Sequence, residues 1–371
     1  MDLPGVKRSS FSLCGRKFLF VGGALPPSLP FAGYGNSDRD FEIRPKEGSM
    51  AGDLRILTHI STQASPTWKE KTTLIQAKPG TLNSFILSLR LYLKRKDFDL
   101  VVVSGGKAGV FFSILQSLLP FRKTPTLMLD CLWYRAKNPL KRSLKRTQIR
   151  LMNQSVRLFL VWAKREIEAY SSEFGIPQEK LKFFPYHTTC EVYDCTVEKG
   201  DYLFSGGNWN RDYKTLVEAT RGLNLRVVIA TNNHLLLRGI DLPENVQVIS
   251  ATDYQFYDLL AKSKMVVVPM AKGFLHSGGQ QTFLNAMFWG KPVIVTDPEG
   301  ASDYIEDRKT GMLVNPGEVR ALRDAISYIL ENPEQVRKMV QEAQRKTQDL
   351  TTEKFFQRII ELAQEIVYGN N

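Results

Sequence analysis

The run MVVVPMAKGFLHSGGQQTFLNAMFWGKPVIVTDPEGASDYIEDRKTGMLVNPG, from Met265 to Gly317, decides how the rest of the chain is interpreted. It begins with a short apolar segment, Met265 to Pro269, which is typical of a buried parallel strand. A polar loop then leads into an apolar-periodic helix that begins near Gln280. A second apolar strand, Pro292 to Thr296, follows Gly290, so the run predicts a strand–helix–strand unit with a right-handed crossover.

The loop of this unit carries a glycine pair directly before the helix. Two glycines let the backbone approach a ligand closely, and the free N–H groups of a helix start favour phosphate. A turn that only shapes the chain is the alternative interpretation of Gly278 and Gly279. Ligands of open α/β sheets bind at the carboxyl ends of the strands, so the candidate ligand contacts are His276, Ser277, Gly278, Gly279, Gln280 and Gln281.

Three further segments of the run carry a family resemblance: NAMFWGKPVI at 285–294, EGASD at 299–303 and TGMLV at 310–314. They resemble the pattern E-A-M-x-x-G-x-P-V-I, G-G-x-x-E and T-G-x-L-V of the retaining family 4 glycosyltransferases. The resemblance implies an α/β protein of GT-B fold, with two Rossmann-like domains facing each other across a cleft. It also implies transfer of a sugar from a nucleotide-diphosphate sugar to a glycan or lipid-linked acceptor, with retention of configuration.

The chain departs from the family at two glutamates, which fall on Ser277 and Asn285. In the family the first lies near the transferred sugar and diphosphate, and the second holds the ribose hydroxyls. An Asn amide still bonds a hydroxyl, without the roughly doubled strength of a charged acceptor. Ribose binding by Asn285 is therefore expected. The alternatives are a catalytically weak GT-B protein that binds a nucleotide sugar without turnover, and a GT-B epimerase or phosphorylase acting on a soluble substrate.

The length of 371 residues exceeds what one core comfortably holds, so two domains are expected. The expected boundaries are 1–188 for an N-terminal Rossmann-like acceptor domain, 189–199 for a linker and 200–350 for a nucleotide-sugar-binding domain. Residues 351–371 would form a helix that crosses back to the first domain. The four cysteines show no disulfide framework or zinc spacing, which indicates a reduced, cytoplasmic setting. No apolar run reaches the roughly 18 residues of a membrane-spanning helix.

Apolar periodicity assigns most other elements. Strands are predicted at Asp53–Ser61, Thr72–Ala77, Leu100–Val103, Thr126–Leu129, Val156–Val161, Lys180–Pro185, Tyr202–Ser205, Arg226–Ala230 and Val246–Ile249. Helices are predicted at Thr81–Lys94, Ala108–Leu119, Lys164–Phe174, Tyr254–Ser263, Val319–Asn332, from Pro333 onward and at Thr351–Tyr368. The first strand is placed at Lys17–Val21. The resemblance implies that Gly22 and Gly23 after it face the donor phosphates, and a plain turn is the alternative.

Asp130 follows a predicted strand of the first domain, at the edge where ligands bind. The resemblance implies a site near the transferred sugar, and a carboxylate there can stabilise a developing positive charge. A structural cap for the next segment is the alternative.

In the second domain, the family clamps the donor diphosphate with an Arg and a Lys. Aligned on the following helix, Arg211 takes the Lys position and Gly206 the Arg position. Arg211 is thus the expected catalytic cation, with Gly207 beside it and Lys214 either helping or simply exposed on the helix. The resemblance also implies that the segment around Ile249 contacts the nucleotide base, mostly through its backbone. No metal or other cofactor is required by this scheme.

The net charge of +12 points to an anionic partner, and ten Lys or Arg with no acid lie between Cys131 and Arg165. Within this run, Leu140 to Met152 forms a basic amphipathic helix, which fits a membrane-surface element. A solvated helix face is the alternative. The candidate lipid contacts are Lys141, Arg142, Lys145 and Arg146, which would place the protein peripherally on the inner face of the plasma membrane. Aromatic residues accompany the run without any recognised nucleic-acid module, so nucleic acid is not an expected partner.

Overall fold

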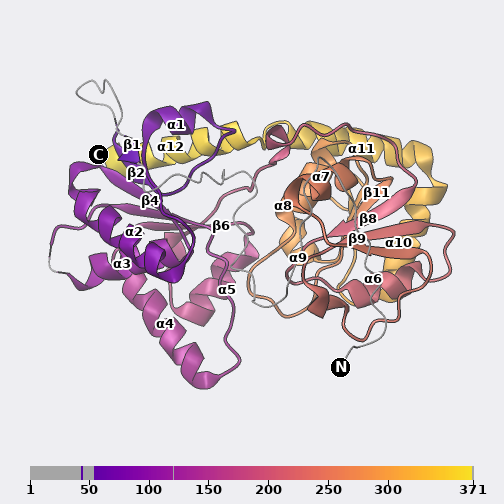
Figure 1. Ribbon diagram of the computed structural model, residues 1–371, viewed down its shortest axis with the longest axis horizontal. Helices are drawn as coiled ribbons and strands as arrows, with labels where there is room; N and C mark the ends of the chain where they lie inside the picture. Colours follow the sequence, from indigo (N-terminus) through magenta and orange to yellow (C-terminus); the bar gives the residue numbers. More distant parts are fainter. Residues whose placement is uncertain (1–42, 45–53, 120, 370–371) are drawn as a thin grey trace, which may run out of the picture. The chain divides into compact units, whose positions relative to one another are not determined.

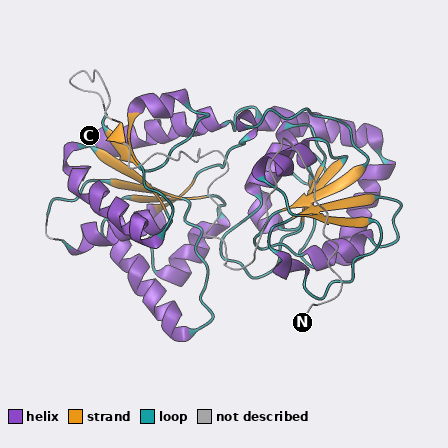
Figure 2. Cartoon of the chain, viewed as in Figure 1, coloured by secondary structure: helices purple, strands orange, loops and turns teal. Residues whose placement is uncertain are grey.

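The computed structural model describes residues 43–44, 54–119 and 121–369 (Figure 1). These residues belong to one compact unit, Ala32–Asn371, and they build two β-sheets with helices packed on them (Figure 2). The strand predicted at Lys17–Val21 and the pair Gly22 and Gly23 lie outside the described residues.

The N-terminal sheet has the strand order β1-β3-β2-β4-β5-β6-β7 among the described residues. All of its neighbouring strands are parallel except β1 and β3, which are antiparallel. The central strands are short and almost wholly apolar, as expected for a parallel sheet covered on both faces. The strands are β1 (Ile43–Arg44), β2 (Ile56–Thr58), β3 (Thr72–Ile75), β4 (Leu100–Ser104), β5 (Thr126–Leu129), β6 (Leu158–Val161) and β7 (Leu181–Phe183).

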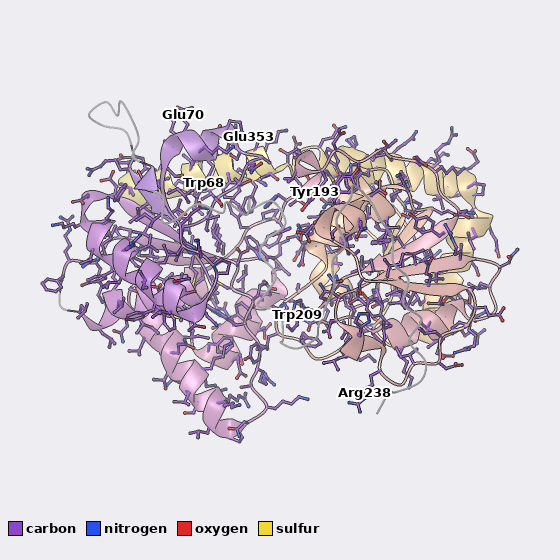
Figure 3. The ribbon with its side chains drawn as sticks, in the orientation of Figure 1. Trp68, Glu70, Tyr193, Trp209, Arg238 and Glu353 are labelled. Atoms are coloured by element: carbon purple, nitrogen blue, oxygen red, sulfur yellow. The ribbon has the colours of Figure 1, made fainter. Side chains whose placement is uncertain are left out.

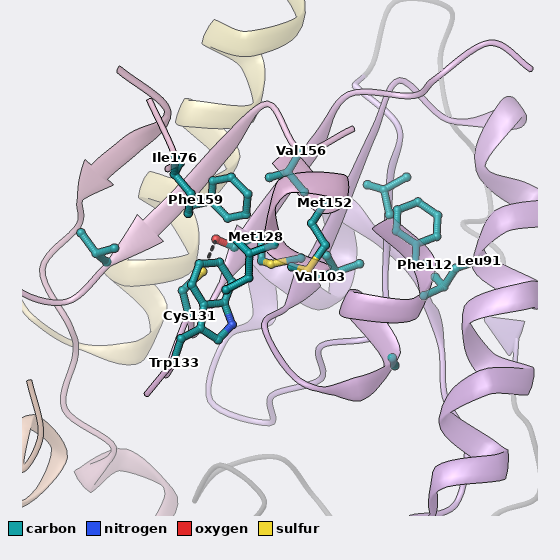
Figure 4. Close-up of a cluster of buried hydrophobic side chains, with 14 of the residues drawn as sticks. Leu91, Val103, Phe112, Met128, Cys131, Trp133, Met152, Val156, Phe159 and Ile176 are labelled. Atoms are coloured by element: carbon teal, nitrogen blue, oxygen red, sulfur yellow. Dashed lines mark hydrogen bonds between the residues drawn. The ribbon is translucent and has the colours of Figure 1, made fainter. Parts of the chain in front are cut away.

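The helices of this half are α1 (Pro66–Lys71), α2 (Thr81–Lys94), α3 (Lys107–Leu118), α4 (Pro139–Asn153) and α5 (Arg165–Phe174). Local sequence explains their ends. The Asn138 side chain accepts from Lys141 N and caps α4 ahead of Pro139, and α5 stops at Gly175 in the left-handed conformation. Their apolar faces bury a continuous core, in which Trp133 packs against Phe159 with ring centroids 5.6 Å apart (Figure 4).

The C-terminal sheet is parallel throughout, in the order β10-β9-β8-β11-β12-β13. Its strands are β8 (Tyr202–Gly206), β9 (Arg226–Ala230), β10 (Val246–Ile249), β11 (Met265–Val268), β12 (Val293–Val295) and β13 (Met312–Leu313). Its helices are α6 (Tyr213–Thr220), α7 (Asp253–Ala261), α8 (Gln280–Phe288), α9 (Pro298–Ala301), α10 (Val319–Glu331) and α11 (Pro333–Thr347). The unit β11–α8–β12 is the predicted strand–helix–strand unit. The predicted α/β fold, with two sheets whose strands are mainly parallel, is therefore confirmed.

The last helix, α12 (Thr352–Tyr368), packs against α1. The rings of Trp68 on α1 and Phe356 on α12 have centroids 4.7 Å apart. Figure 3 labels Trp68 on α1 and Glu353 near the start of α12. Phe355 of the same helix packs against Phe184, just after β7, with ring centroids 5.3 Å apart. Phe355 and Phe356 are both buried, so α12 fills part of the core of the N-terminal half.

Sequence periodicity missed some short elements. Helix α1 has six residues, too few for a recognisable period, and its start is marked only by the Ser65 cap and Pro66. Strand β13 has two residues. Short 3₁₀ helices were also not predicted: η1 (Arg95–Asp97), η2 (Gln178–Lys180), η3 (Cys190–Val192) and η4 (His234–Leu237).

Candidate functional site

The turn between β11 and α8 presents free backbone donors. Gly279 is the residue before α8, with φ of 86°, and no side chain caps the helix. Among the described residues, no acceptor bonds the N–H groups of Gly279, Gln280 and Gln281. A Cβ on Gly279 would lie 2.6 Å from Val268 Cγ1, so only glycine fits. This helix start therefore has the properties of an anion site.

A second loop places Arg211 beside this turn. Asp212 N donates to Pro269 O at 2.8 Å, and Ala271 N donates to Asn210 O at 2.9 Å, which joins the loop after β8 to the chain after β11. The Arg211 guanidinium donates to Gly206 O at 3.0 Å and to Trp209 O at 3.1 Å. Its Nη2 atom lies 3.7 Å from where a Cβ on Gly279 would be. The backbone thus fixes the cation next to the free N–H groups.

Arg211 is a cation without a carboxylate counterion among residues 43–44, 54–119 and 121–369. No carboxylate within the described part of the chain forms an ion pair with it, and partial burial lowers the pKa of its guanidinium. Removing an unpaired charge even partly from water costs free energy. A bound anion would remove that cost, so the electrostatics of the site favour a phosphate.

Two further polar side chains belong to this turn. Gln280 is buried, and its Nε2 has no hydrogen-bond acceptor in the part of the chain that the structure describes. His276 has Nδ1 3.0 Å from Ser277 O and Nε2 3.3 Å from Asn210 Nδ2, which fits a neutral ring that donates from Nδ1. Burial lowers the pKa of His276, which favours this neutral form.

The two positions that carry glutamates in the family make internal contacts here. Asn285 is fully buried; its Oδ1 accepts from Thr189 N at 2.8 Å, and its Nδ2 donates to Thr189 Oγ1 at 2.9 Å. Ser277 N donates to Glu166 Oε1 at 2.5 Å, and Ser277 Oγ accepts from Arg165 Nε at 3.0 Å. Ribose binding by Asn285 stays a prediction, and it would require Thr189 to release this amide.

Arg165 and Glu166, at the start of α5, are site neighbours that sequence reasoning missed. Arg165 also donates to Asp297 Oδ2 at 3.0 Å and lies 3.4 Å from Glu299 Oε2. Burial raises the pKa of Glu166 to about 7, against the lowering effect of three backbone N–H bonds. In the sequence both residues belong to a charged helix start, which usually means a solvated surface, and nothing local marks their contact with Ser277.

The structure brings the remaining candidates only partly together. Gly207 adjoins Arg211, since a Cβ on it would meet Arg211 Nη2 at 2.7 Å. Lys214 is exposed, and Ile249 O accepts from Thr231 N. Asp130 is buried with φ of 56°, and burial raises the pKa of its carboxyl. Within the described ranges, no hydrogen bond or ion pair joins Asp130, Lys214 or Ile249 to the glycine turn.

Comparison with protein families gives one match. Residues 209–346 match the family model described as "Glycosyl transferases group 1". This segment contains Arg211, the glycine turn and α8. No curated protein sequence matches the chain.

Solved structures are similar over most of the chain. A sucrose-phosphate synthase from Thermosynechococcus elongatus has 15% identity and a TM-score of 0.65, covering 86% of this chain and 90% of that one. A glycosyltransferase from Rickettsia africae has 14% identity and a TM-score of 0.61, covering 86% of this chain and 100% of that one. Anabaena HepE in complex with UDP has 15% identity and a TM-score of 0.62, covering 84% of this chain and 99% of that one. Together with the two parallel sheets, these likenesses assign the GT-B fold, and the family match supports a glycosyltransferase.

Proposed function

We propose that this protein transfers a sugar from a nucleotide-diphosphate sugar to an acceptor hydroxyl, with retention of configuration. The observation that carries the proposal is the half-buried Arg211, which has no carboxylate partner among the described residues and lies beside the free N–H groups at the start of α8. A nucleoside diphosphate supplies the missing negative charge. The resemblance described above supplies the expectation of retention.

In this reaction the leaving diphosphate gains negative charge as its bond to the sugar breaks. Arg211 and the N–H groups of Gly279, Gln280 and Gln281 would stabilise that charge, because they already lie beside one another before the donor binds. The Nε2 of Gln280, which has no acceptor among the described residues, can donate to a phosphate or sugar oxygen. Because cationic and dipolar groups meet the charge, the proposal requires no metal.

Titration calorimetry with UDP and GDP tests the donor site. Anabaena HepE has been solved with UDP and with UDP-glucose, so UDP is the first probe. We expect saturable binding of one of the two nucleotides by the full chain, weakened by high salt because the contact is ionic. Failure of both nucleotides to bind at millimolar concentration would contradict the proposal.

A second function is a nucleotide-sugar-binding protein with little turnover. The observation that favours it is that Ser277 and Asn285 are held by contacts within the protein. An assay of donor consumption over a panel of UDP- and GDP-sugars separates the two functions. Binding without hydrolysis or transfer would favour the binding protein, and sugar transfer would exclude it.

We further propose that the acceptor is at a membrane and that the N-terminal half contacts an anionic lipid surface. Helix α2 exposes a row of apolar side chains at helical spacing: Leu82, Phe85, Leu89 and Leu93, of which Leu82 is 71% exposed. Neither α2 nor α3 contains an acidic residue, and α4 exposes Leu140 and Leu144 between cations. Apolar residues bordered by cations suit an anionic bilayer surface. No helix in the described ranges is long and apolar enough to span a membrane.

The four candidate cations of α4 differ in their surroundings. Arg142 donates to both carboxylate oxygens of Glu173 at 2.6 Å, and Arg146 Nε donates to Glu173 O at 2.7 Å. Lys145 Nζ lies 4.0 Å from the centre of the Tyr134 ring, and Lys141 is exposed. The two lysines can therefore be changed without leaving the buried Glu173 side chain unpaired.

Replacing Lys141 and Lys145 by Gln should weaken association with vesicles containing anionic lipid. Each cation near such a surface contributes about 1 kcal/mol, so the double variant should bind about 30-fold more weakly. Vesicle co-sedimentation at two salt concentrations measures this loss. Replacing Lys338 and Lys346 of α11 by Gln is the matched control. Equal binding by both double variants would remove α4 from the membrane contact.

A further inference from the structure

We propose that Arg165 and Glu166, the first residues of α5, are positioning residues that orient the glycine turn and thereby set the affinity for a nucleoside diphosphate. The inference rests on the proposed function, since the turn is the proposed diphosphate site. Neither residue touches that site directly. Both act on Ser277, the residue before the glycine pair.

The glycine turn cannot orient itself. Gly278 and Gly279 have no side chains, so their backbones reach many conformations at similar energy, and the free N–H groups can point in many directions. The preceding loop from Lys272 to His276 lies outside the helices and strands. A contact that fixes Ser277 therefore fixes the direction in which the chain enters the turn.

Glu166 makes that contact from within the protein. Its carboxylate accepts from Ser277 N at 2.5 Å through Oε1, and from Trp162 N at 2.8 Å and Ala163 N at 3.3 Å through Oε2. Its side chain is 1% exposed, so water does not compete for these bonds. The carboxylate thus links the chain before α5 to the peptide that precedes the turn.

Arg165 holds the same residue from the other side. Its Nε donates to Ser277 Oγ at 3.0 Å, and its Nη2 donates to Asp297 Oδ2 at 3.0 Å. The two acceptors lie close together, because a Cβ on Gly300 would come within 2.7 Å of Ser277 Oγ and 2.4 Å of Asp297 Oδ2. Arg165 therefore ties the glycine turn to the chain after β12.

The Glu166 contact responds to pH. Burial raises the pKa of Glu166 from 4.5 to about 7, and the other ionisable groups that face it are Arg165, Tyr170, Cys131 and Tyr304. Burial also raises the pKa of both tyrosines and of Cys131, so these three are neutral near pH 7. Above about pH 7 the carboxylate is ionised and accepts all three N–H bonds. Below that pH it takes up a proton and loses acceptor capacity toward Ser277 N.

Glu166→Gln tests the inference, because an amide does not titrate. UDP affinity is measured by calorimetry between pH 6 and pH 8 for the wild type, Glu166→Gln and Glu168→Gln. Glu168 is the matched control, since it is an exposed glutamate on the same helix. From pH 8 to pH 6 the wild type and the Glu168 variant should lose about tenfold more affinity than Glu166→Gln. The titration of UDP itself is common to all three and cancels.

Parallel pH profiles for the wild type and Glu166→Gln would overturn the inference. Hydrogen exchange at the Ser277 amide gives a second readout that needs no ligand. We expect this amide to lose protection in Glu166→Gln at pH 8, with retained thermal stability, and to keep it in Glu168→Gln. If the wild type binds no nucleotide, the proposed function fails. If exchange protection of the Ser277 amide still depends on Glu166 in that case, Glu166 positions the turn, but the turn is not a nucleotide site. Unchanged protection overturns the inference.

Discussion

Arg211→Ala will weaken UDP binding by about 1.5 to 3 kcal/mol, the range for hydrogen bonds to charged groups, which is about 10- to 150-fold in affinity. The guanidinium is half-buried and has no carboxylate partner in the described part of the chain, so a bound diphosphate would be its main counterion. Its bonds to Gly206 O and Trp209 O fix its position before the ligand arrives. Calorimetry of the purified variant measures the loss.

Two controls accompany Arg211→Ala. Lys214→Ala removes an exposed cation from the first turn of α6, and we expect its UDP affinity to stay close to that of the wild type. Arg211→Lys keeps the charge but loses the planar pair of donors, so an intermediate affinity is expected. Wild-type affinity in Arg211→Ala, with the fold intact by circular dichroism, would exclude this residue from the site.

Trp68→Ala will lower the free energy of unfolding by about 3 to 5 kcal/mol, the usual cost of truncating a large buried aromatic side chain. Trp68 is 1% exposed and packs on Phe356 of α12, and its Nε1 donates to Ile60 O at 2.8 Å. The substitution leaves a cavity between α1 and α12 and an unpaired carbonyl oxygen. Urea denaturation followed by circular dichroism measures the change.

Trp209→Ala is the matched control for Trp68→Ala. Trp209 is 58% exposed, so its loss should change stability by no more than about 0.5 kcal/mol. A double-mutant cycle with Phe356→Ala then isolates the contact between α1 and α12. If Trp68→Ala unfolds at the wild-type urea concentration, the contact contributes nothing to stability.

The fold could be predicted where the chain repeats a simple pattern. The predicted strands Arg226–Ala230 and Val246–Ile249 and the helix Thr81–Lys94 coincide with β9, β10 and α2. Each has an apolar period or a fully apolar run long enough to recognise. Helix α1 could not be found this way, because its six residues bury a single large side chain, that of Trp68.

The candidate site was predictable in part for a different reason. Gly278, Gly279 and Arg211 lie in local motifs, so a resemblance reaches them. The partners of Ser277 lie 111 and 112 residues away in the chain, at Glu166 and Arg165. Thr189, which bonds Asn285, is 96 residues away. Only the packing of the two halves brings such residues together, and no local pattern encodes it.

The packing of α12 on α1 has a consequence for how the chain folds during synthesis. Phe355 and Phe356 complete apolar contacts of the N-terminal half, although almost 300 residues separate Trp68 from Phe356. While the ribosome is still translating the middle of the message, that half exposes the apolar surface that these rings will cover. Its final tertiary structure therefore forms only after α12 has been synthesised, and until then its uncovered apolar surface favours aggregation.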